Sequence, residues 1–396
     1  MRYSIVALLF GALACQPGES FEEIGLQYAI DTLAGVQRVV SRGTAPTWRL
    51  EPVVSLGSEG GIGEPAPDEF GRVVAVTTDA DGNLFVADRH FLEIRVFDRS
   101  GNLIRQIGRQ GGGPGEFEDI YSMAWIDTVL LVLDFRLGRI AELSGEGEWL
   151  GSRPSPGRIS GPPSLLRLFQ ASRDLVYQWS LGPDGGRVWV EHGIDGITVE
   201  RPQHNLDRPE PTGVMCSRAD GGISFFDIPF GPKMFEHPTV GGSVMTAWSA
   251  QYAIALVDPN GDTVRVIERE REPVPISNAE WEDATREFED FKEEWPGAEC
   301  EPRGFPRPEF KHAFTNLLLD VDGRLWVEAV TPSGTEWDVF STDGRLVGTV
   351  PGFDYDRSLA PALNGDDIAW ISRDSLGVQR VHLARLFEGQ ETPTES

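Results

Sequence analysis

The chain has 396 residues, of which 40% are hydrophobic and 10% aromatic, and its formal net charge is −27. This length allows two average domains or one large repeat domain, and the composition is that of a packed globular protein, not of a disordered chain. The negative charge argues against binding to nucleic acid or to an anionic membrane surface by charge alone.

The N-terminus has the features of an export signal. Arg2 precedes an apolar run over residues 5–14, which is too short to span a bilayer but suits the apolar core of a signal peptide. Cys15 follows Ala14, and the sequence ALAC resembles a bacterial lipobox, although Ala12 stands where leucine is usual. The resemblance implies that residues 1–15 are a signal and that Cys15 carries a lipid anchor, the chain's only contact with a membrane. The alternative is an ordinary secretory signal with an unmodified cysteine.

Sequence repeats organise the rest of the chain. The segment that begins NLFVADRHFLEIRVFDRSGNLI at Asn83 aligns without gaps on the segment that begins at Val129, 46 residues further on. Each copy alternates β-rich runs with Asp/Gly turns such as DADGN (residues 79–83), which favour tight hairpins. Four antiparallel strands in each period of about 40 to 50 residues are typical of a β-propeller blade. We therefore expect an all-β, six-bladed propeller of four-stranded blades, centred near residues 90, 136, 180, 253, 330 and 375.

The domain boundaries follow from this pattern. Residues 16–44 are expected to be an N-terminal linker or an extra strand, residues 45–386 the propeller, and residues 387–396 a flexible tail. The segment TWRLEPVVSLG, residues 47–57, precedes the first blade without partners of its own. It is expected to complete the last blade and close the ring, which removes open sheet edges. The strand-like pieces within residues 201–231 have no assigned place.

One segment, residues 277–295, has a helical pattern. Ser277 and Glu280 have the spacing of a capping box, and apolar residues recur every three or four positions, which makes one stripe along a helix: Trp281, Ala284, Phe288, Phe291 and Trp295. One interpretation is an inserted helix that docks on the propeller by this stripe. The other is a partner-binding helix, which requires the stripe to be exposed.

Residues 81–117, beginning DGNLFVADRHFLEIRVFDRSGNLIRQIG, resemble an NHL-type repeat. The resemblance is close over residues 69–152 and looser over 235–350, and the chain as a whole resembles bacterial six-bladed β-propeller lipoproteins. Most members of that group have no assigned activity. The resemblance therefore implies the fold and an exported, envelope-anchored protein, and it implies little about function.

The glycine-rich stretch GRQGGGPGEF, residues 108–117, could be a phosphate cradle or a connector between blades. A P-loop needs Gly-Lys-Ser/Thr and a following helix, whereas Gly115 is followed by Glu116 and Phe117. A second copy occurs at residues 56–70, one blade earlier. We interpret both copies as connectors in which glycine allows sharp backbone turns.

Metal and nucleophile motifs are not indicated. DADGN does not have the glycine and glutamate spacing of an EF-hand, so its aspartates are interpreted as turn residues. The six histidines show no zinc-finger spacing, and a G-x-S-x-G motif is absent. We expect no cofactor and no metal, although single residues from several blades could still meet in the central channel.

Candidate binding residues come from the connectors between the second and third strands of each blade, which share one face with the connectors between blades. Loops on a rigid scaffold commonly carry function, and a mixture of charged and aromatic side chains suits a polar ligand. The candidates are Arg89, His90, Arg136, Trp179, Glu328 and Arg373. For Asp88 and Asp134 we favour a bracing role, in which the carboxylates accept hydrogen bonds from backbone N–H groups of their own connectors.

Cys216 and Cys300 are either a disulfide, as an oxidising compartment would allow, or two isolated thiols. The sequence favours a monomeric, exported scaffold that binds a protein, peptide or glycan through its loop face. The alternative is an enzyme on the same fold, a metal-assisted lactonase, esterase or lyase. Three or more Asp, Glu, His or Asn side chains converging in the central channel would favour that alternative.

Overall fold

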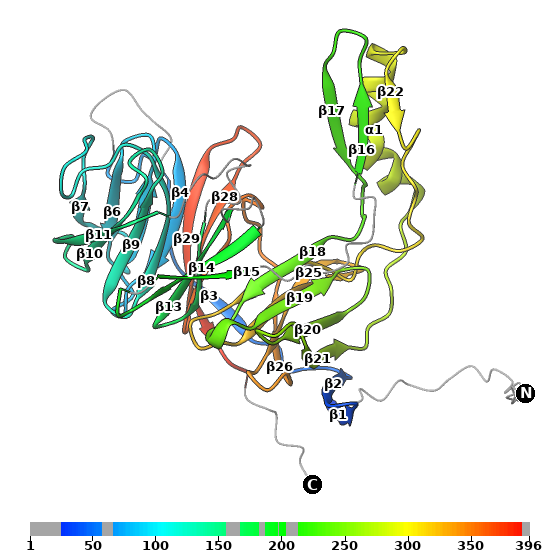
Figure 1. Cartoon of the computed structure of the whole chain (residues 1–396), viewed down its shortest axis with the longest axis horizontal. Coiled ribbons are helices and arrows are strands. Elements are labelled where there is room, and N and C mark those ends of the chain that lie inside the picture. Colours follow the sequence, from blue (N-terminus) through cyan, green and yellow to red (C-terminus); the bar gives the residue numbers. More distant parts are fainter. Residues whose placement is uncertain are drawn as a thin grey trace, which may run out of the picture.

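The computed structural model describes residues 25–57, 66–155, 167–181, 187–196, 198–202 and 213–389. Within these ranges the chain is almost entirely β-structure, with one α-helix (Figure 1). No helix in them is long and apolar enough to cross a bilayer. The segment proposed as an export signal, residues 1–15, lies outside the described residues.

Six sheets, each built on the four antiparallel strands of a blade, follow one another as a propeller; five have four strands and the fourth carries two more, which confirms the fold predicted from the repeats. The first two blades are β4 (Val73–Thr78), β5 (Leu84–Asp88), β6 (Glu93–Phe97) and β7 (Leu103–Ile107), then β8 (Ile120–Ile126), β9 (Val129–Asp134), β10 (Arg139–Ser144) and β11 (Trp149–Pro154). The third and fourth are β12 (Leu168–Ser172), β13 (Leu175–Leu181), β14 (Arg187–Gly193) and β15 (Thr198–Pro202), then β18 (Met234–Pro238), β19 (Val244–Trp248), β20 (Ala253–Val257) and β21 (Thr263–Arg269). The fifth is β23 (Phe314–Leu319), β24 (Leu325–Thr331), β25 (Gly334–Phe340) and β26 (Leu346–Pro351).

The sixth blade combines strands from both ends of the chain. Strands β27 (Ala362–Asn364), β28 (Asp367–Arg373) and β29 (Gln379–Phe387) are followed in the sheet by β3 (Arg49–Leu56). The antiparallel register of β3 on β29 runs from Arg49 opposite Phe387 to Leu56 opposite Val381. This pairing joins the N-terminal and C-terminal parts of the propeller and covers the outer edge of β29.

An N-terminal hairpin extends the fourth blade. Strand β1 (Gln27–Leu33) pairs with β2 (Val36–Arg42), and β2 pairs in parallel with β21. The fourth blade therefore has six strands instead of four. Arg38 of β2 forms a two-point ion pair with Glu268 of β21, with N···O distances of 2.8 and 2.6 Å, which aligns the two strands across the seam.

Aspartate turns connect the strands within the blades. Asp79 accepts the backbone N–H groups of Asp81 and Asn83 and the side-chain amide of Asn83. Asp98 makes the same set of hydrogen bonds with Ser100 and Asn102. These are Asx turns, and they confirm the interpretation of the aspartates as turn residues.

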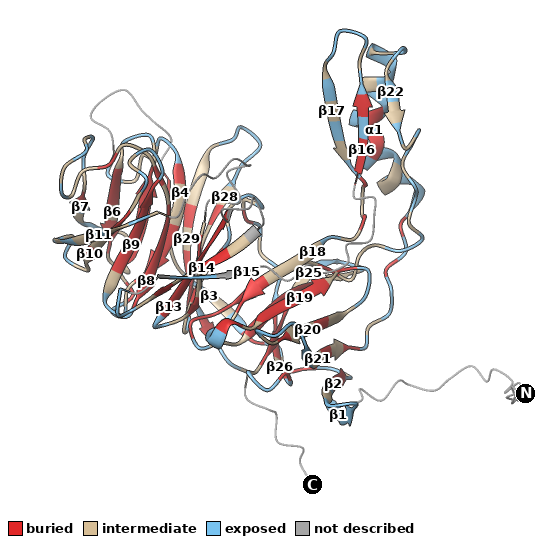
Figure 2. Ribbon diagram, in the orientation of Figure 1, coloured by how far each residue is buried: buried red, intermediate tan, exposed pale blue. Residues whose placement is uncertain are grey.

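The cores lie between neighbouring blades, where the strands are buried on both faces (Figure 2). Separate apolar clusters join the first blade to the second, the second to the third, the fourth to the fifth, the fifth to the sixth and the sixth to the first. Between the third and fourth blades, Tyr177 donates a hydrogen bond to the carbonyl of Thr239, and the Phe169 ring meets His237 edge to face. Successive blades therefore pack on one another around a common centre.

Two excursions of the chain form an arm that stands away from the blades (Figure 1). The first carries β16 (Gly213–Ser217) and β17 (Ile223–Asp227), between β15 and β18; the second carries α1 (Asn278–Glu294) and β22 (Glu299–Glu301), between β21 and β23. The strands join in the order β17-β16-β22, and Cys216 and Cys300 form a disulfide between β16 and β22. The arm thus contains the pieces of residues 201–231 that the repeat pattern leaves without a place.

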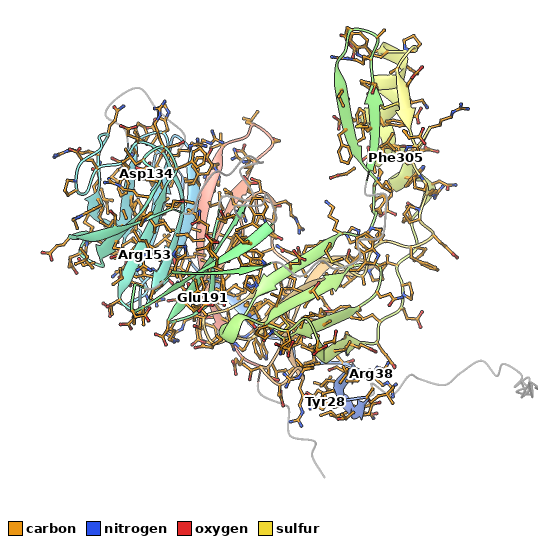
Figure 3. The ribbon with its side chains drawn as sticks, viewed as in Figure 1. Tyr28, Arg38, Asp134, Arg153, Glu191 and Phe305 are labelled. Atoms are coloured by element: carbon orange, nitrogen blue, oxygen red, sulfur yellow. A yellow bond between two sulfur atoms is a disulfide. The ribbon has the colours of Figure 1, made fainter. Side chains whose placement is uncertain are left out.

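Helix α1 begins with the capping box expected at Ser277 and Glu280, but its stripe does not dock on the propeller. Phe288 is 2% exposed and packs on Phe226 and Phe305, with ring centroids 5.2 and 4.5 Å apart; Figure 3 shows Phe305 inside the arm. Both interpretations of the stripe were therefore wrong, because the helix covers the sheet of its own arm. Sequence periodicity identifies an apolar face but not the surface that the face meets.

Candidate binding site at the central cavity

The face that carries the connectors between blades, together with the connectors between second and third strands, is called the loop face. Asp88 is fully buried there and accepts hydrogen bonds from the backbone N–H groups of Gly71, Arg72, His90 and Phe91, at 2.7, 3.0, 2.9 and 3.3 Å. Asp134 repeats this pattern one blade later with Glu118, Asp119 and Leu137 (Figure 3). The bracing role predicted for both aspartates is confirmed.

The glycine-rich connector at residues 108–117 closes on itself. Phe117 is fully buried, and its backbone N–H donates to the carbonyl of Arg109 at 2.8 Å. Glu116 accepts hydrogen bonds from Arg109 and from the backbone N–H of Gly113. A carboxylate of the loop thus takes the backbone donor that a phosphate would need, which confirms the interpretation as a connector. The earlier copy falls partly in residues 58–65, outside the described residues.

His90 and Arg136 are exposed on the loop face, on the connectors of the first and second blades. Arg136 keeps most of its side-chain surface in solvent, with Glu118 3.9 Å away. Arg89 is more constrained, because its guanidinium lies over the Tyr121 ring and donates to Asp119 at 2.5 Å. Arg89 therefore holds the first blade to the second.

Glu328 is fully buried instead of facing solvent. Its carboxylate accepts hydrogen bonds from the hydroxyls of Thr315, Thr335 and Tyr355, at 2.6, 3.1 and 2.9 Å, and forms an ion pair with Arg357. Burial and the nearby carboxylate raise the pKa of Tyr355. The expectation that Glu328 faces a ligand directly was wrong, because its oxygens are used within the protein. Thr315 and Thr335 belong to the neighbouring strands β23 and β25, and Tyr355 and Arg357 belong to the segment before the sixth blade.

Trp179 also requires correction. It is 6% exposed and packs in an apolar cluster with Leu175, Tyr177 and Trp189. Its position in β13 comes before the connector, so its large ring contributes to packing within the third blade. The weak repeat signal in this blade left the strand boundary too uncertain to separate a strand residue from a loop residue.

Arg373, at the end of β28, donates to Asp356 at 2.5 Å. Asp356 also accepts from the hydroxyl and the backbone N–H of Ser358, at 2.6 and 3.0 Å. These hydrogen bonds contribute to the lowered pKa of Asp356, which burial opposes. Arg373 is thus the exposed partner in an ion pair that orders the segment at residues 355–358.

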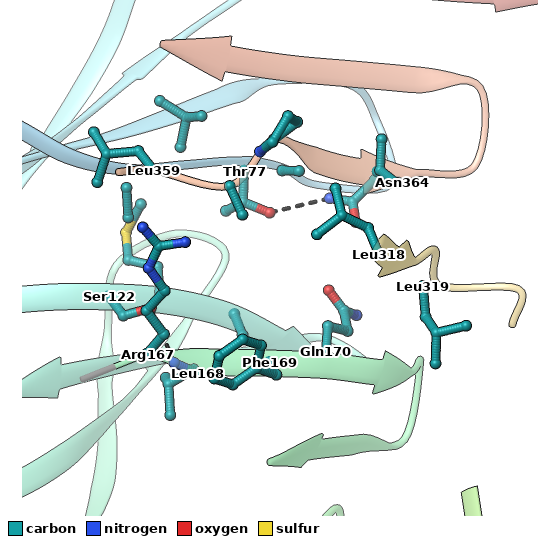
Figure 4. A pocket seen from close by; sticks show the side chains of 18 of the residues that line it. Thr77, Ser122, Arg167, Leu168, Phe169, Gln170, Leu318, Leu319, Leu359 and Asn364 are labelled. Carbon is teal, nitrogen blue, oxygen red and sulfur yellow. Dashed lines mark hydrogen bonds between the residues drawn. The ribbon is translucent and has the colours of Figure 1, made fainter. Parts of the chain in front are cut away.

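A cavity of about 110 Å³ lies at the centre of the blades (Figure 4). It is lined by the first strands of several blades, because in a propeller these strands face the common axis. Most of the lining is apolar, including Met123, Phe169, Leu318 and Leu359. The polar side chains of the lining are Thr77, Tyr121, Ser122, Arg167, Gln170, His237 and Asn364, and the Tyr121 hydroxyl already accepts from Arg89.

Arg167 is the side chain in this lining that is charged at neutral pH. It stands directly before β12, and Figure 4 shows it extending towards Leu359 of the facing segment. Burial lowers the pKa of Arg167, and the negative charge of Asp356 opposes that effect. Asp356 is already held by Arg373, and Arg167 forms no hydrogen bond or ion pair with another described residue. Because this partly buried guanidinium has no carboxylate partner, it is the group in the cavity that most favours binding of an acidic ligand.

The other polar groups of the cavity are largely satisfied. The side-chain amide of Asn364 donates to the hydroxyl of Thr77 at 3.0 Å and to the carbonyl of Thr78 at 2.8 Å (Figure 4). Burial lowers the pKa of His237 to about 4, so its ring is neutral at pH 7, and its Nδ1 lies 3.0 Å from the carbonyl oxygen of Pro238. Ser122 accepts the backbone N–H of Leu168 at 3.1 Å, which leaves its hydroxyl proton available as a donor beside Arg167.

The face opposite the loop face carries a groove of about 620 Å³ that shares Gln170, Val321 and Asn364 with the cavity. Arginines line this groove as well, but each has a carboxylate partner. The pairs are Arg99–Asp367, Arg105–Glu146, Arg173–Asp322 and Arg385–Asp366. The unpaired positive charge therefore lies at the loop-face end of the cavity.

Arg167, Ser122 and Asn364 are not among the residues that the sequence motifs indicate. A signal existed: once two blades are aligned, the first strand of each is expected to face the axis, and alternate residues on it point inwards. Arg167 comes before the weakest of the predicted blades, where this alignment is least constrained. Only the packing of all six blades brings Arg167 opposite Leu359.

Comparison with known proteins supports the fold. Residues 69–152, the first blade and most of the second, match the model of a family described as a 6-bladed beta-propeller. A search of curated proteins gives no match.

Several solved structures are similar. They include a member of the duf4221 family from Bacteroides vulgatus, with 10% sequence identity, a TM-score of 0.45, and coverage of 87% of this chain and 100% of that one. BamB from Moraxella catarrhalis has 12% identity, a TM-score of 0.35, and coverage of 92% and 99%. Virginiamycin B lyase from Staphylococcus aureus has 11% identity, a TM-score of 0.35, and coverage of 80% and 95%. At these identities and TM-scores the likenesses say nothing about activity.

Proposed function

We propose that the chain is an exported binding protein that takes a protein, peptide or glycan ligand on its loop face, with an acidic group of that ligand at Arg167. The observation that carries the proposal is the partly buried guanidinium at the cavity mouth, which has no partner among the described residues. A buried cation without a counter-ion is costly, and a carboxylate or phosphate of a ligand would supply that counter-ion in two-point geometry.

The size of the cavity limits what can enter. A volume of about 110 Å³ accommodates one acidic group or a short side chain, not a whole oligosaccharide or folded partner. The rest of the ligand would lie on the loop face, where His90 and Arg136 are exposed. The proposal is therefore an extended ligand that inserts an acidic end or branch into the cavity.

The enzyme alternative has less support from the lining. Of the Asp, Glu, His and Asn side chains in the described part of the chain, His237 and Asn364 reach this cavity. The low pKa of His237 keeps its ring uncharged at neutral pH, and the side-chain amide of Asn364 already donates to Thr77 and Thr78. A paired acid and base, or the three convergent ligands that a metal-assisted lyase or lactonase would need, are not supplied by these two residues.

Export and lipid anchoring form part of the same proposal. The disulfide between Cys216 and Cys300 supports an oxidising compartment, and the apolar run before Cys15 supports a signal peptide. We expect Cys15 to be the lipidated N-terminus of the mature chain in the bacterial cell envelope. Mass spectrometry of the membrane fraction tests this, and an unmodified Cys15 would contradict it.

The binding proposal is tested with arrays of glycans and peptides, each acidic probe printed beside its neutral counterpart. The matched variants are Arg167→Met and Arg136→Met, which remove the same charge from the cavity and from the exposed loop face. We expect acidic probes to bind and Arg167→Met to weaken binding about tenfold or more, with a much smaller loss for Arg136→Met. Equal losses in both variants, or preference for neutral probes, would refute the role of Arg167.

A further inference from the structure

The sheet of the arm has one covered face and one open face. Val214, Cys216 and Phe226 pack with Phe288 of α1. Neighbouring residues in the same strands point the other way, because successive side chains of a strand alternate between faces. On that open face Met215, Ile223 and Phe225 are 50%, 69% and 60% exposed. Three large apolar side chains gathered on one small sheet suggest a binding surface more than chance exposure.

The outer edge of the same sheet is also open. Strand β17 lies at the end of the order β17-β16-β22 and pairs with β16 within the described part of the chain. Its sequence, ISFFD, contains neither lysine nor proline, the residues that commonly protect an edge strand from pairing with another chain. The edge can therefore accept a further strand through its backbone groups.

A groove of about 780 Å³ runs between this edge and α1. Its aromatic residues are Phe225, Phe226 and Phe291, and α1 adds four carboxylates spaced four, three and four residues apart, which is one stripe of a helix: Asp283, Glu287, Asp290 and Glu294. The one cation in the described lining, Arg286, is paired with Asp283 at 2.7 Å. The groove therefore combines an apolar edge with a surplus of negative charge.

We propose that the edge of β17 binds an extended basic segment of a partner protein, which adds to the arm as a fourth strand. The alternation of a strand defines the partner's sequence pattern. One set of side chains would continue the open face beside Ile223 and Phe225 and should be apolar. The other set would face the carboxylates of α1 and should be Lys or Arg, which can also lie on aromatic rings. This surface is separate from the cavity at Arg167, so either proposal can fail alone.

A second copy of the chain does not satisfy these requirements. The net charge of −27 opposes self-association, and β17 itself carries an aspartate and no cation. Pairing two β17 edges would also place the acidic α1 stripes of both copies on one shared sheet. Charge complementarity therefore selects a basic partner.

The test uses the full chain and fluorescent octapeptides in which Lys alternates with Val, Ile or Phe, measured by anisotropy. Matched peptides carry Glu in place of Lys. The variant pair Glu287→Lys with Asp290→Lys reverses charge in the groove; the control pair Glu282→Lys with Glu293→Lys makes the same charge change on another side of α1. We expect the Lys peptides to bind, the groove variant to weaken binding about tenfold, and the control to change it less than about twofold.

Strand addition has its own signature. Alternate backbone amides of the Lys peptide can be N-methylated. Binding should be abolished when the methylated amides are those that face β17, and it should be intact when they are the amides that face away from β17. Binding should also slow amide hydrogen exchange in residues 223–227. The proposal is overturned if no Lys peptide binds, if Glu peptides bind equally, if the control pair loses as much affinity as the groove pair, or if neither set of N-methyl groups matters. A dimer that Phe225→Ser dissociates would also overturn it.

Discussion

Asp88→Ala removes the carboxylate that braces the connector into the first blade. Four backbone N–H groups lose their acceptor, and a hydrogen bond to a charged group contributes about 1.5–3 kcal/mol. His90 is exposed, so the N–H groups of His90 and Phe91 can turn to water. Gly71 and Arg72 are exposed as residues too, but their N–H groups point inwards at the fully buried Asp88 carboxylate. We therefore expect the free energy of unfolding to fall by about 3–5 kcal/mol.

Urea unfolding followed by tryptophan fluorescence measures this loss as a shift of the midpoint at unchanged slope. The matched variant is Asp98→Ala, which also removes an aspartate that accepts three hydrogen bonds, but from an exposed turn. Water can replace the carboxylate there, so a loss of about 1 kcal/mol is expected. If Asp88→Ala costs no more than Asp98→Ala, the bracing argument is wrong.

Two further variants test the interior and the connectors. Burial lowers the pKa of His192 to about 4, and neither ring nitrogen has a hydrogen-bond partner among the described residues. Because the folded pKa lies below the ordinary 6.5, the stabilising contribution is complete above about pH 6.5 and is lost as the pH falls towards 4, at up to about 1.4 kcal/mol per pH unit. His192→Leu should remove that part of the slope between pH 7 and pH 5, and an unchanged slope would contradict the assignment. Gly108 has a φ of +91°, and a Cβ there would lie 2.5 Å from the Phe117 ring, whereas Gly115 has a φ of +71° and open space around it. In urea unfolding, Gly108→Ala should therefore cost clearly more than the about 1 kcal/mol of backbone strain expected for Gly115→Ala; equal costs would show that Phe117 gives way.

Local sequence signals predicted the blades because propeller blades are built from local contacts. The 46-residue offset between the copies at Asn83 and Val129 reflects two sheets whose strands follow one another directly. Asp79 and Asp98 form their turns within five residues, and Ser277 caps its helix within four. Such features need no knowledge of the rest of the chain.

Contacts between segments that are distant in the sequence leave no such local signal. Strands β16 and β22 meet across a separation of 84 residues between Cys216 and Cys300, and β22 has three residues, too few to show a strand pattern. The helix stripe therefore had no visible partner in the sequence. Glu328 shows the same limit for the site, because its charge suggested exposure while Thr315, Tyr355 and Arg357 bury and satisfy it.

The crystal structure of the chain with an acidic ligand selected on the arrays tests the central claim most directly. The account predicts that a carboxylate or phosphate of the ligand lies within hydrogen-bonding distance of the Arg167 guanidinium, at the loop-face end of the cavity, with the rest of the ligand on the loop face. A ligand bound elsewhere, with Arg167 free of its acidic group, would contradict the account.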